Sequence, residues 1–428
     1  MQIQNPERLV SALRELSPSA NDHFSLASLN PECTQFRLAR DKAVSVGPVV
    51  DALVEILKSE PVLVALDNTQ IRTSPTSGCS WDLSHVAQWL LAQARRRDPV
   101  HVVQDLSEFL ATSSLQALEV MPLWGLNPSR QIPLYNDIRL VPLSDVPATI
   151  PKDMLCSVPS SRLPDSNNFA RVSRPLAALV RPFKHEPVFN PAFDGDLQWA
   201  ERFRSAHQYR KAEMNEIARV LTLVRDSPVF PIAHWFQIPE DTPVLGSVGG
   251  WSGGHFRPAF LRLIKVDDYA DTEMADLVEV YMNRDIRLRE RLDVPLERLR
   301  TAMLQESLES TAIDLGIALE SLLTHEQDSE APISYRLRLR ATHLLGGTRD
   351  NRIENAKRFR VLYVLRSRAA HGAKVTDSAL RDAAGSGTAA AFLSDCAKLT
   401  SLMIRRLIDR GALPDWEGLA MGWEELLP

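Results

Sequence analysis

The chain has 428 residues, 44% of them hydrophobic, and a formal net charge of −5. This length predicts two or three domains with a sizeable core, and the charge excludes a protein that is basic throughout. The first residues show no basic segment followed by an apolar one, and no run approaches the roughly eighteen apolar residues of a membrane span. We therefore expect a cytoplasmic protein without membrane contact. The four cysteines lie far apart without a C-x2-C pair, so no metal and no cofactor are predicted.

Residues 1–115 are expected to form a mostly helical N-terminal region. Three segments have helical periodicity, at residues 6–16, 46–59 and 83–97. Asp82 or Ser84 is a suitable N-cap for the third of them. Between the second and third segments, Pro61–Asp67 is apolar and fits either a short buried strand or a packed helix.

Residues 116–266 differ in composition, with frequent prolines between short aliphatic segments, which is typical of strands and turns. Strands are predicted at residues 131–134, 137–141, 229–238 and 256–266. The segment 159–168 is the best linker candidate. A glycine-rich connection at 246–255 carries Trp251 at its tip, where an exposed indole can stack on an unpaired base.

Residues 267–428 have the pattern of a helical bundle, so the fold class is α+β and mostly α. Helices are predicted at residues 277–288, from 295 to 322, at 335–345 and at 391–408. Pro295 is placed at the first position of the second helix, where proline is favoured. The final segment, from Asp415 to Glu425, either caps the bundle or folds over its basic part.

The charges are unevenly distributed. Residues 331–376 contain eleven Lys and Arg against two acids, a local charge of +9, which leaves −14 for the rest of the chain. A basic segment on an acidic chain indicates an anionic partner for that segment alone.

Within this basic segment, residues 352–370 lack proline and glycine and have helical periodicity. Gly372 then predicts a left-handed C-cap, which places His371 beside the helix carbonyls. Arg366 and His371 are five residues apart, about 140° around a straight helix, so one helix does not aim both at a single point. Either the chain turns His371 back, or a second copy of the helix completes the site.

Three strings carry a resemblance to a known family. They are Ala312–Leu323, Ile333–Gly346 and Leu362–Gly372, and in this order and spacing they resemble the ApeA-like branch of the HEPN superfamily over residues 294–410. The resemblance implies a helical bundle that forms a homodimer and a metal-independent endoribonuclease. It also implies that Arg366 and His371 are the catalytic pair, acting on RNA to leave 2′,3′-cyclic phosphate ends.

The resemblance further implies a toxin or anti-phage defence effector, held silent until an unknown trigger reaches the N-terminal regions. The position after the arginine is often Asn in that family, and Ser367 keeps only its polarity. The rival interpretation is a non-catalytic HEPN module for RNA binding or dimerisation.

Other residues are assigned to supporting roles. Ser367, Arg368 and Tyr363 lie beside the pair, although Tyr363 also fits the core. Glu320 interrupts an apolar stretch and needs a partner if buried. Its simplest role is a salt bridge to Arg338 or Arg340, and the alternative is to orient Arg366 or tune His371. The residues predicted to contact RNA are Arg336, Arg340, Lys357, Arg358, Arg360 and Lys374.

Overall fold

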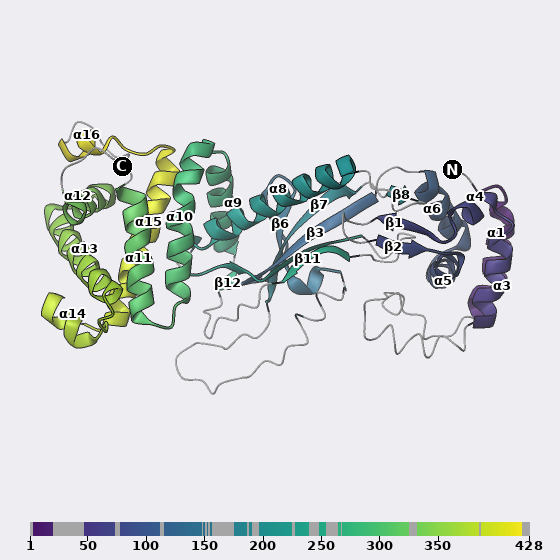
Figure 1. Ribbon diagram of the computed structural model, residues 1–428, viewed down its shortest axis with the longest axis horizontal. Coiled ribbons are helices and arrows are strands. Elements are labelled where there is room, and N and C mark those ends of the chain that lie inside the picture. Colours follow the sequence, from purple (N-terminus) through teal and green to yellow (C-terminus); the bar gives the residue numbers. More distant parts are fainter. Residues whose placement is uncertain are drawn as a thin grey trace.

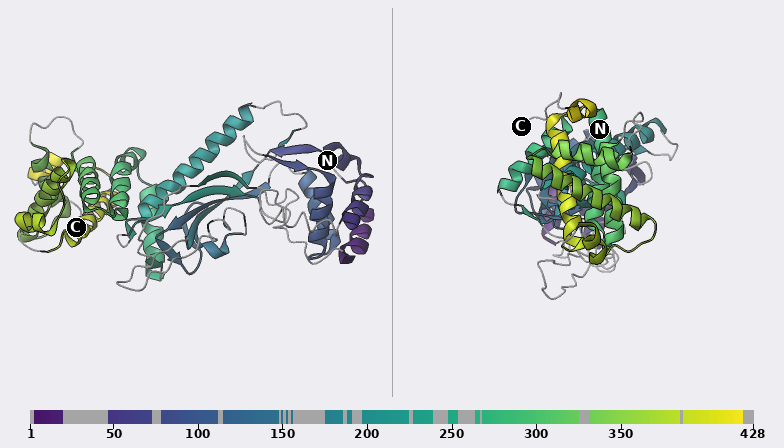
Figure 2. Two further views of the ribbon diagram at one scale, coloured as in Figure 1. Left: turned by 60° about the horizontal axis from the view of Figure 1, so that its bottom comes forward. Right: turned by 90° about the vertical axis from the view of Figure 1, so that its left-hand side faces the viewer.

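The structure is a computed structural model. It describes residues 3–19, 47–72, 78–111, 115–147, 175–185, 188–190, 197–224, 227–238, 248–253, 264–266, 268–324, 332–384 and 387–421, with positions 149, 152 and 155. N-terminal helices, a central sheet and C-terminal helices follow one another along the long axis, so the first and last described helices lie at opposite ends (Figure 1). Figure 2 shows the same succession from two other directions.

The N-terminal region is mostly helical, as predicted. Its helices are α1 (Pro6–Leu16), α3 (Gly47–Leu57), α4 (Pro61–Leu66), α5 (Leu83–Ala94) and α6 (Pro99–Ala111), with a 3-10 turn, η1 (Ser17–Ser19). Asp82 caps α5 by accepting the backbone N–H of His85 at 2.8 Å, which confirms one of the two predicted caps. The apolar segment at Pro61 is a helix, α4, because the proline starts it where its missing N–H costs nothing.

An antiparallel sheet forms the middle of the molecule. Six strands run in the order β11-β10-β3-β7-β6-β5, and the short β9 also pairs with β3. Their bounds are β3 (Leu115–Trp124), β5 (Ile132–Tyr135), β6 (Ile138–Pro142), β7 (Ala177–His185), β9 (Phe230–Pro231), β10 (Ala233–Gln237) and β11 (Val248–Gly253). Helix α8 (Leu197–Leu221) lies along the sheet (Figure 1).

Further short pairings lie outside this sheet. Strand β1 (Thr69–Arg72) pairs antiparallel with β2 (Gly78–Trp81) and β8 (Val188–Asn190). Strand β4 (Leu126–Pro128) pairs parallel with β12 (Ile264–Val266), and a 3-10 turn, η3 (Leu143–Asp145), follows β6.

The strands predicted at 131–134 and 137–141 are confirmed as β5 and β6, which pair antiparallel. Asn136 takes a φ of 48° between them, a left-handed conformation that asparagine tolerates well in tight turns. The predicted strand at 229–238 corresponds to β9 and β10. Trp251, however, lies within strand β11 and not at a loop tip, because this glycine-rich segment pairs with β10. The predicted linker at 159–168 lies outside the described residues.

Charged side chains are buried where α8 meets the sheet. Glu119 on β3 has a fully buried side chain, with its carboxylate 3.0 Å from His207 Nδ1 and 3.0 Å from Arg210 Nε, both on α8. The ring of His234 on β10 lies 4.9 Å from that of His207 and is also buried. Burial, more than the neighbouring cations, lowers the pKa of His234 to about 3. A sealed ionic group therefore interrupts the apolar face of the sheet.

The C-terminal part is entirely helical among its described residues. It contains α9 (Asp268–Met282), α10 (Ile286–Leu304), α11 (Leu308–Leu323), α12 (Ile333–Leu345), α13 (Arg349–Ala370), α14 (Asp377–Ala384), α15 (Ala389–Arg410) and α16 (Trp416–Met421). The helix predicted from Pro295 to Leu322 is wrong as a single element. The chain breaks after Leu304, Ser307 caps α11, and Pro295 lies inside α10.

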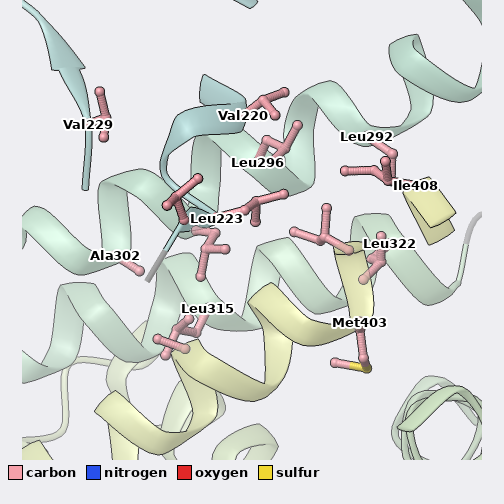
Figure 3. Packing of buried hydrophobic residues seen from close by; sticks show 14 of the residues in the cluster. Val220, Leu223, Val229, Leu292, Leu296, Ala302, Leu315, Leu322, Met403 and Ile408 are labelled. Carbon is pink, nitrogen blue, oxygen red and sulfur yellow. The ribbon is translucent and has the colours of Figure 1, made fainter. Parts of the chain in front are cut away.

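One hydrophobic cluster runs from the sheet into the bundle. It joins residues of β3 and β7 with residues of α8, α10, α11, α13 and α15. Figure 3 shows Val220 and Leu223 at the end of α8 close to Leu296 of α10 and near side chains of α11 and α15. The hydrophobic core thus continues across the predicted boundary at residue 266. No helix among the described residues is long and apolar enough to cross a membrane.

Candidate active site

Helix α13 carries the predicted catalytic pair, and both of its ends are defined by local chemistry. At the start, Thr348 and Asn351 form a capping box, each side chain accepting the other's backbone N–H. At the end, Gly372 takes a φ of 82°, its N–H bonds the carbonyl of Ala369, and the next N–H bonds that of Arg368. This is a Schellman motif, and it confirms Gly372 as the predicted left-handed residue.

Arg366 leaves α13 toward the neighbouring helix α11. Its Nη2 donates to Glu320 Oε2 at 3.0 Å, and both side chains are about a quarter exposed, at 28% and 23%. Its stem crosses α11 at Gly316, where an added Cβ would overlap the arginine Cγ and lie 3.1 Å from its Cβ. Gly316 and Glu320 are one turn apart on α11, so together they form a seat for the arginine.

Burial and the ion pair act on the pKa of Glu320 in opposite directions. Burial raises the pKa of its carboxyl above the ordinary value, and the Arg366 guanidinium acts in the opposite direction. Its partner is Arg366, so the simpler prediction of a bridge to Arg338 or Arg340 is wrong. The alternative role, orienting Arg366, agrees with the contact.

His371 is the C-cap of α13 and is exposed. Its backbone N–H bonds the carbonyls of Ser367 and Arg368, so the chain keeps the helical path through His371 and turns away only at Gly372. The chain therefore does not turn His371 back toward Arg366. Within one chain, the histidine and the arginine leave different sides of α13.

The loop after His371 is fastened to the start of α11. Glu309 accepts the N–H of Val375 at 2.8 Å and the hydroxyl of Ser307 at 2.7 Å. These hydrogen bonds, first that of Val375, lower the pKa of Glu309 to about 2. The loop that follows the histidine is thus held at Val375 by a carboxylate 66 residues earlier in the chain.

The other supporting residues differ in exposure. Tyr363 is partly buried and packs against the main core, the role that its spacing also allowed. Ser367 is half-buried and Arg368 is exposed.

Among the residues predicted to contact RNA, exposure separates two groups. Lys357, Arg360 and Lys374 are exposed. Arg358 is partly buried and pairs with Glu354 at 3.1 Å, and Arg336 is also partly buried.

Arg340 does not belong to this surface, and its assignment to RNA binding is corrected. It is buried, its Nη1 donates to the carbonyl of Leu323 at 2.6 Å, and its guanidinium lies 5.1 Å from the centre of the Trp416 ring. The arginine closes the end of α11 and holds α16 against the bundle. Helix α16 is thereby the predicted cap of the bundle, and residues after 421 lie outside the described part.

Two residues of the site were not anticipated from the sequence. Gly316 could have been found from the sequence, because a glycine inside a helix costs about 1 kcal/mol relative to alanine and usually has a packing reason. No sequence signal pointed to Glu309, since its contact with Val375 forms only when the chain folds. Among the described residues, no group of three or more His, Cys, Asp or Glu is arranged to hold a metal ion.

No protein-family model, curated protein or solved structure matches the chain. The geometry of the site and the sequence resemblance are therefore the grounds for a function.

Proposed function

We propose that the protein is a metal-independent endoribonuclease of the HEPN type. The observation that carries the proposal lies at the end of α13. An exposed imidazole at His371 follows, by five residues, an arginine that is seated by Gly316 and Glu320 and remains partly exposed. The segment 355–376 around the pair contains no acid, which suits an anionic substrate.

The chemistry requires three functions. A base takes the proton of the 2′-hydroxyl, whose oxygen attacks the adjacent phosphorus, and an acid returns a proton to the departing 5′-oxygen. An imidazole can give or take a proton, so His371 can serve as the base or as the acid. Arg366 donates charged hydrogen bonds to the phosphate as negative charge develops on it. The products end in a 2′,3′-cyclic phosphate and a 5′-hydroxyl.

We propose that two copies of the chain complete the site. Arg366 and His371 lie about 140° apart around α13, and the helical path continues through His371. A homodimer through the C-terminal bundle supplies the arginine of one copy and the histidine of the other, or pairs the two histidines as acid and base.

The N-terminal two thirds are proposed to control the nuclease, as in a toxin or anti-phage defence effector that awaits a trigger. Helix α1 lies at the far end of the molecule from α13 (Figure 1), and the core that joins the sheet to the bundle provides a physical connection. Toxicity on expression that disappears with Arg366→Ala supports this part, and toxicity that persists opposes it.

The second candidate is a non-catalytic module for RNA binding or dimerisation. The observation that favours it is the ion pair itself, because Glu320 already occupies one donor of Arg366. This candidate predicts RNA binding, or none, without product.

The decisive experiment incubates the purified protein with total cellular RNA in EDTA and determines the fragment ends. The variants are His371→Ala and, as a matched control, His101→Ala, which removes an exposed histidine of α6. We expect cyclic phosphate ends from wild type and control, and a loss of about a hundredfold or more with His371→Ala. Equal cleavage by His371→Ala contradicts the assignment, and binding without cleavage favours the second candidate.

A further inference from the structure

A row of exposed side chains runs along α13 and ends at His371. At about 100° per residue its members lie within about 80° of one another, and the row is about 27 Å long. All of them are exposed, and they are Ile353, Lys357, Arg360, Val364, Arg368 and His371. Arg366 points away from this row, so the row is a surface distinct from the arginine seat.

The charge of the row indicates its ligand. Three permanent cations, Lys357, Arg360 and Arg368, lie on it, and the segment from Asn355 to Thr376 contains no Asp or Glu. The nearby Glu354 is paired with Arg358, at the edge of the row. Like charge opposes packing the three cations of a second copy on those of this row, whereas an extended polyanion is attracted along its whole length.

The apolar members of the row indicate the form of that polyanion. Ile353 and Val364 are 43% and 39% exposed, and Lys357 and Arg360 lie between them on the row. In a duplex the base faces are stacked and hidden, and a protein meets mainly phosphates and sugars. An unpaired strand offers both phosphates to the cations of the row and base faces to its two aliphatic side chains.

We propose that this row binds an unpaired RNA strand lying along α13, with the phosphate to be cut at the His371 end. The substrate class is then single-stranded RNA that extends several nucleotides to one side of the cleavage position. The inference rests on the proposed nuclease function for its cleavage step, whereas the binding step is tested separately.

Binding is measured on the full-length His371→Ala protein with a fluorescent unpaired oligouridine of about 15 nucleotides, within the range of known single-strand sites, and with a duplex of equal length. We expect the unpaired strand to bind at least tenfold more tightly. Adding Arg360→Ala lowers the slope of log affinity against log salt by about 0.7, which is about fivefold in affinity at 0.1 M salt.

The matched control is Arg352→Ala, which removes an exposed arginine from the same helix about 100° away from the row. We expect it to change affinity less than twofold. Val364→Ser is expected to weaken binding of the unpaired strand without changing the salt slope. Equal losses from Arg360→Ala and Arg352→Ala, or equal binding of strand and duplex, overturn the inference.

Cleavage by the same variants, without the His371 substitution, separates this inference from the proposed function. If wild type cuts RNA and Arg360→Ala raises KM about fivefold with kcat unchanged, the nuclease function and the binding row are both supported. If wild type cuts and Arg360→Ala matches the Arg352→Ala control, only the inference falls. If wild type does not cut RNA but the row binds the unpaired strand selectively, the proposed nuclease function is contradicted and the proposed binding site is supported.

Discussion

Two carboxylates in different regions of the molecule each form an ion pair with an arginine, but they differ in their exposure to solvent. Glu119, between the sheet and α8, has a fully buried side chain and two basic partners, His207 and Arg210. Glu320, in the bundle, remains 23% exposed and pairs with Arg366, which is 28% exposed. The first carboxylate is closed to solvent, whereas the second keeps one side open to water.

This difference in exposure indicates which of the two ion pairs can bind a ligand. In a largely buried group each charge depends on the others, because little water is available to replace a missing partner. In a half-open pair, solvent screens the attraction, and an incoming phosphate can share the guanidinium without leaving a buried charge alone. The same type of contact is thus structural in the sheet and suited to a site in the bundle.

The largest test of this contrast removes each carboxylate in turn. Glu119→Gln is expected to lower the free energy of unfolding by about 3–5 kcal/mol, because it removes the fully buried carboxylate from Arg210, whose side chain is only 15% exposed. Glu320→Gln, its matched counterpart, is expected to cost less than about 1 kcal/mol. Denaturant unfolding of the full chain measures both values. Similar losses of unfolding free energy from the two substitutions would contradict the difference between the two ion pairs.

The second test uses pH and concerns the sheet region. His234 has a pKa of about 3 in the folded protein against an ordinary 6.5, so the unfolded chain binds the extra proton between these values. Stability therefore falls as the pH drops from 6.5 toward 3, by about 1.4 kcal/mol at pH 5.5 from this group alone. His234→Phe is expected to remove that share of the pH dependence, and an unchanged dependence in unfolding experiments contradicts the prediction.

The third test concerns the open pair. Gly316→Ala places a methyl group where the stem of Arg366 now lies. The flexible stem shifts and alanine favours the helix by about 1 kcal/mol, so stability is expected to change by less than about 1 kcal/mol. RNA cleavage is expected to fall about tenfold to a hundredfold, because the guanidinium is displaced.

The control for this third test is Ser321→Ala on the same helix, whose hydroxyl bonds only carbonyls of α11 in the described structure. Unchanged cleavage by Gly316→Ala shows that the seat does not position the arginine.

The smallest expected effect concerns Glu309, which fastens the loop after His371. Its folded pKa of about 2 lies below the ordinary 4.5, so its stabilisation is present above about pH 4.5 and is lost as the pH falls toward 2. Glu309→Gln is expected to make unfolding less dependent on pH in that window. Acid titration followed by circular dichroism measures this, and identical curves for variant and wild type refute it.

Local chemistry made part of the architecture predictable. The two strands beside Asn136, Asp82 as one of two candidate caps, and the end of α13 at Gly372 were all predicted, because strands, turns and caps depend on residues a few positions apart. The long helix from Pro295 was not predicted correctly. Its apolar periodicity continues past Leu304, while the break there is fixed by the cap at Ser307 and by packing of α10 on α11.

The sequence by itself placed Arg366 and His371 five residues apart at the end of one helix, in a stretch, residues 355–376, that contains no acid. Only the tertiary structure decided which of the surrounding charges face the site. It seated Arg366 on Gly316 and Glu320, buried Arg340 against Trp416, and left the row ending at His371 exposed. The physical reason is that periodicity specifies the faces of one helix, whereas partners come from helices that meet only when the core closes.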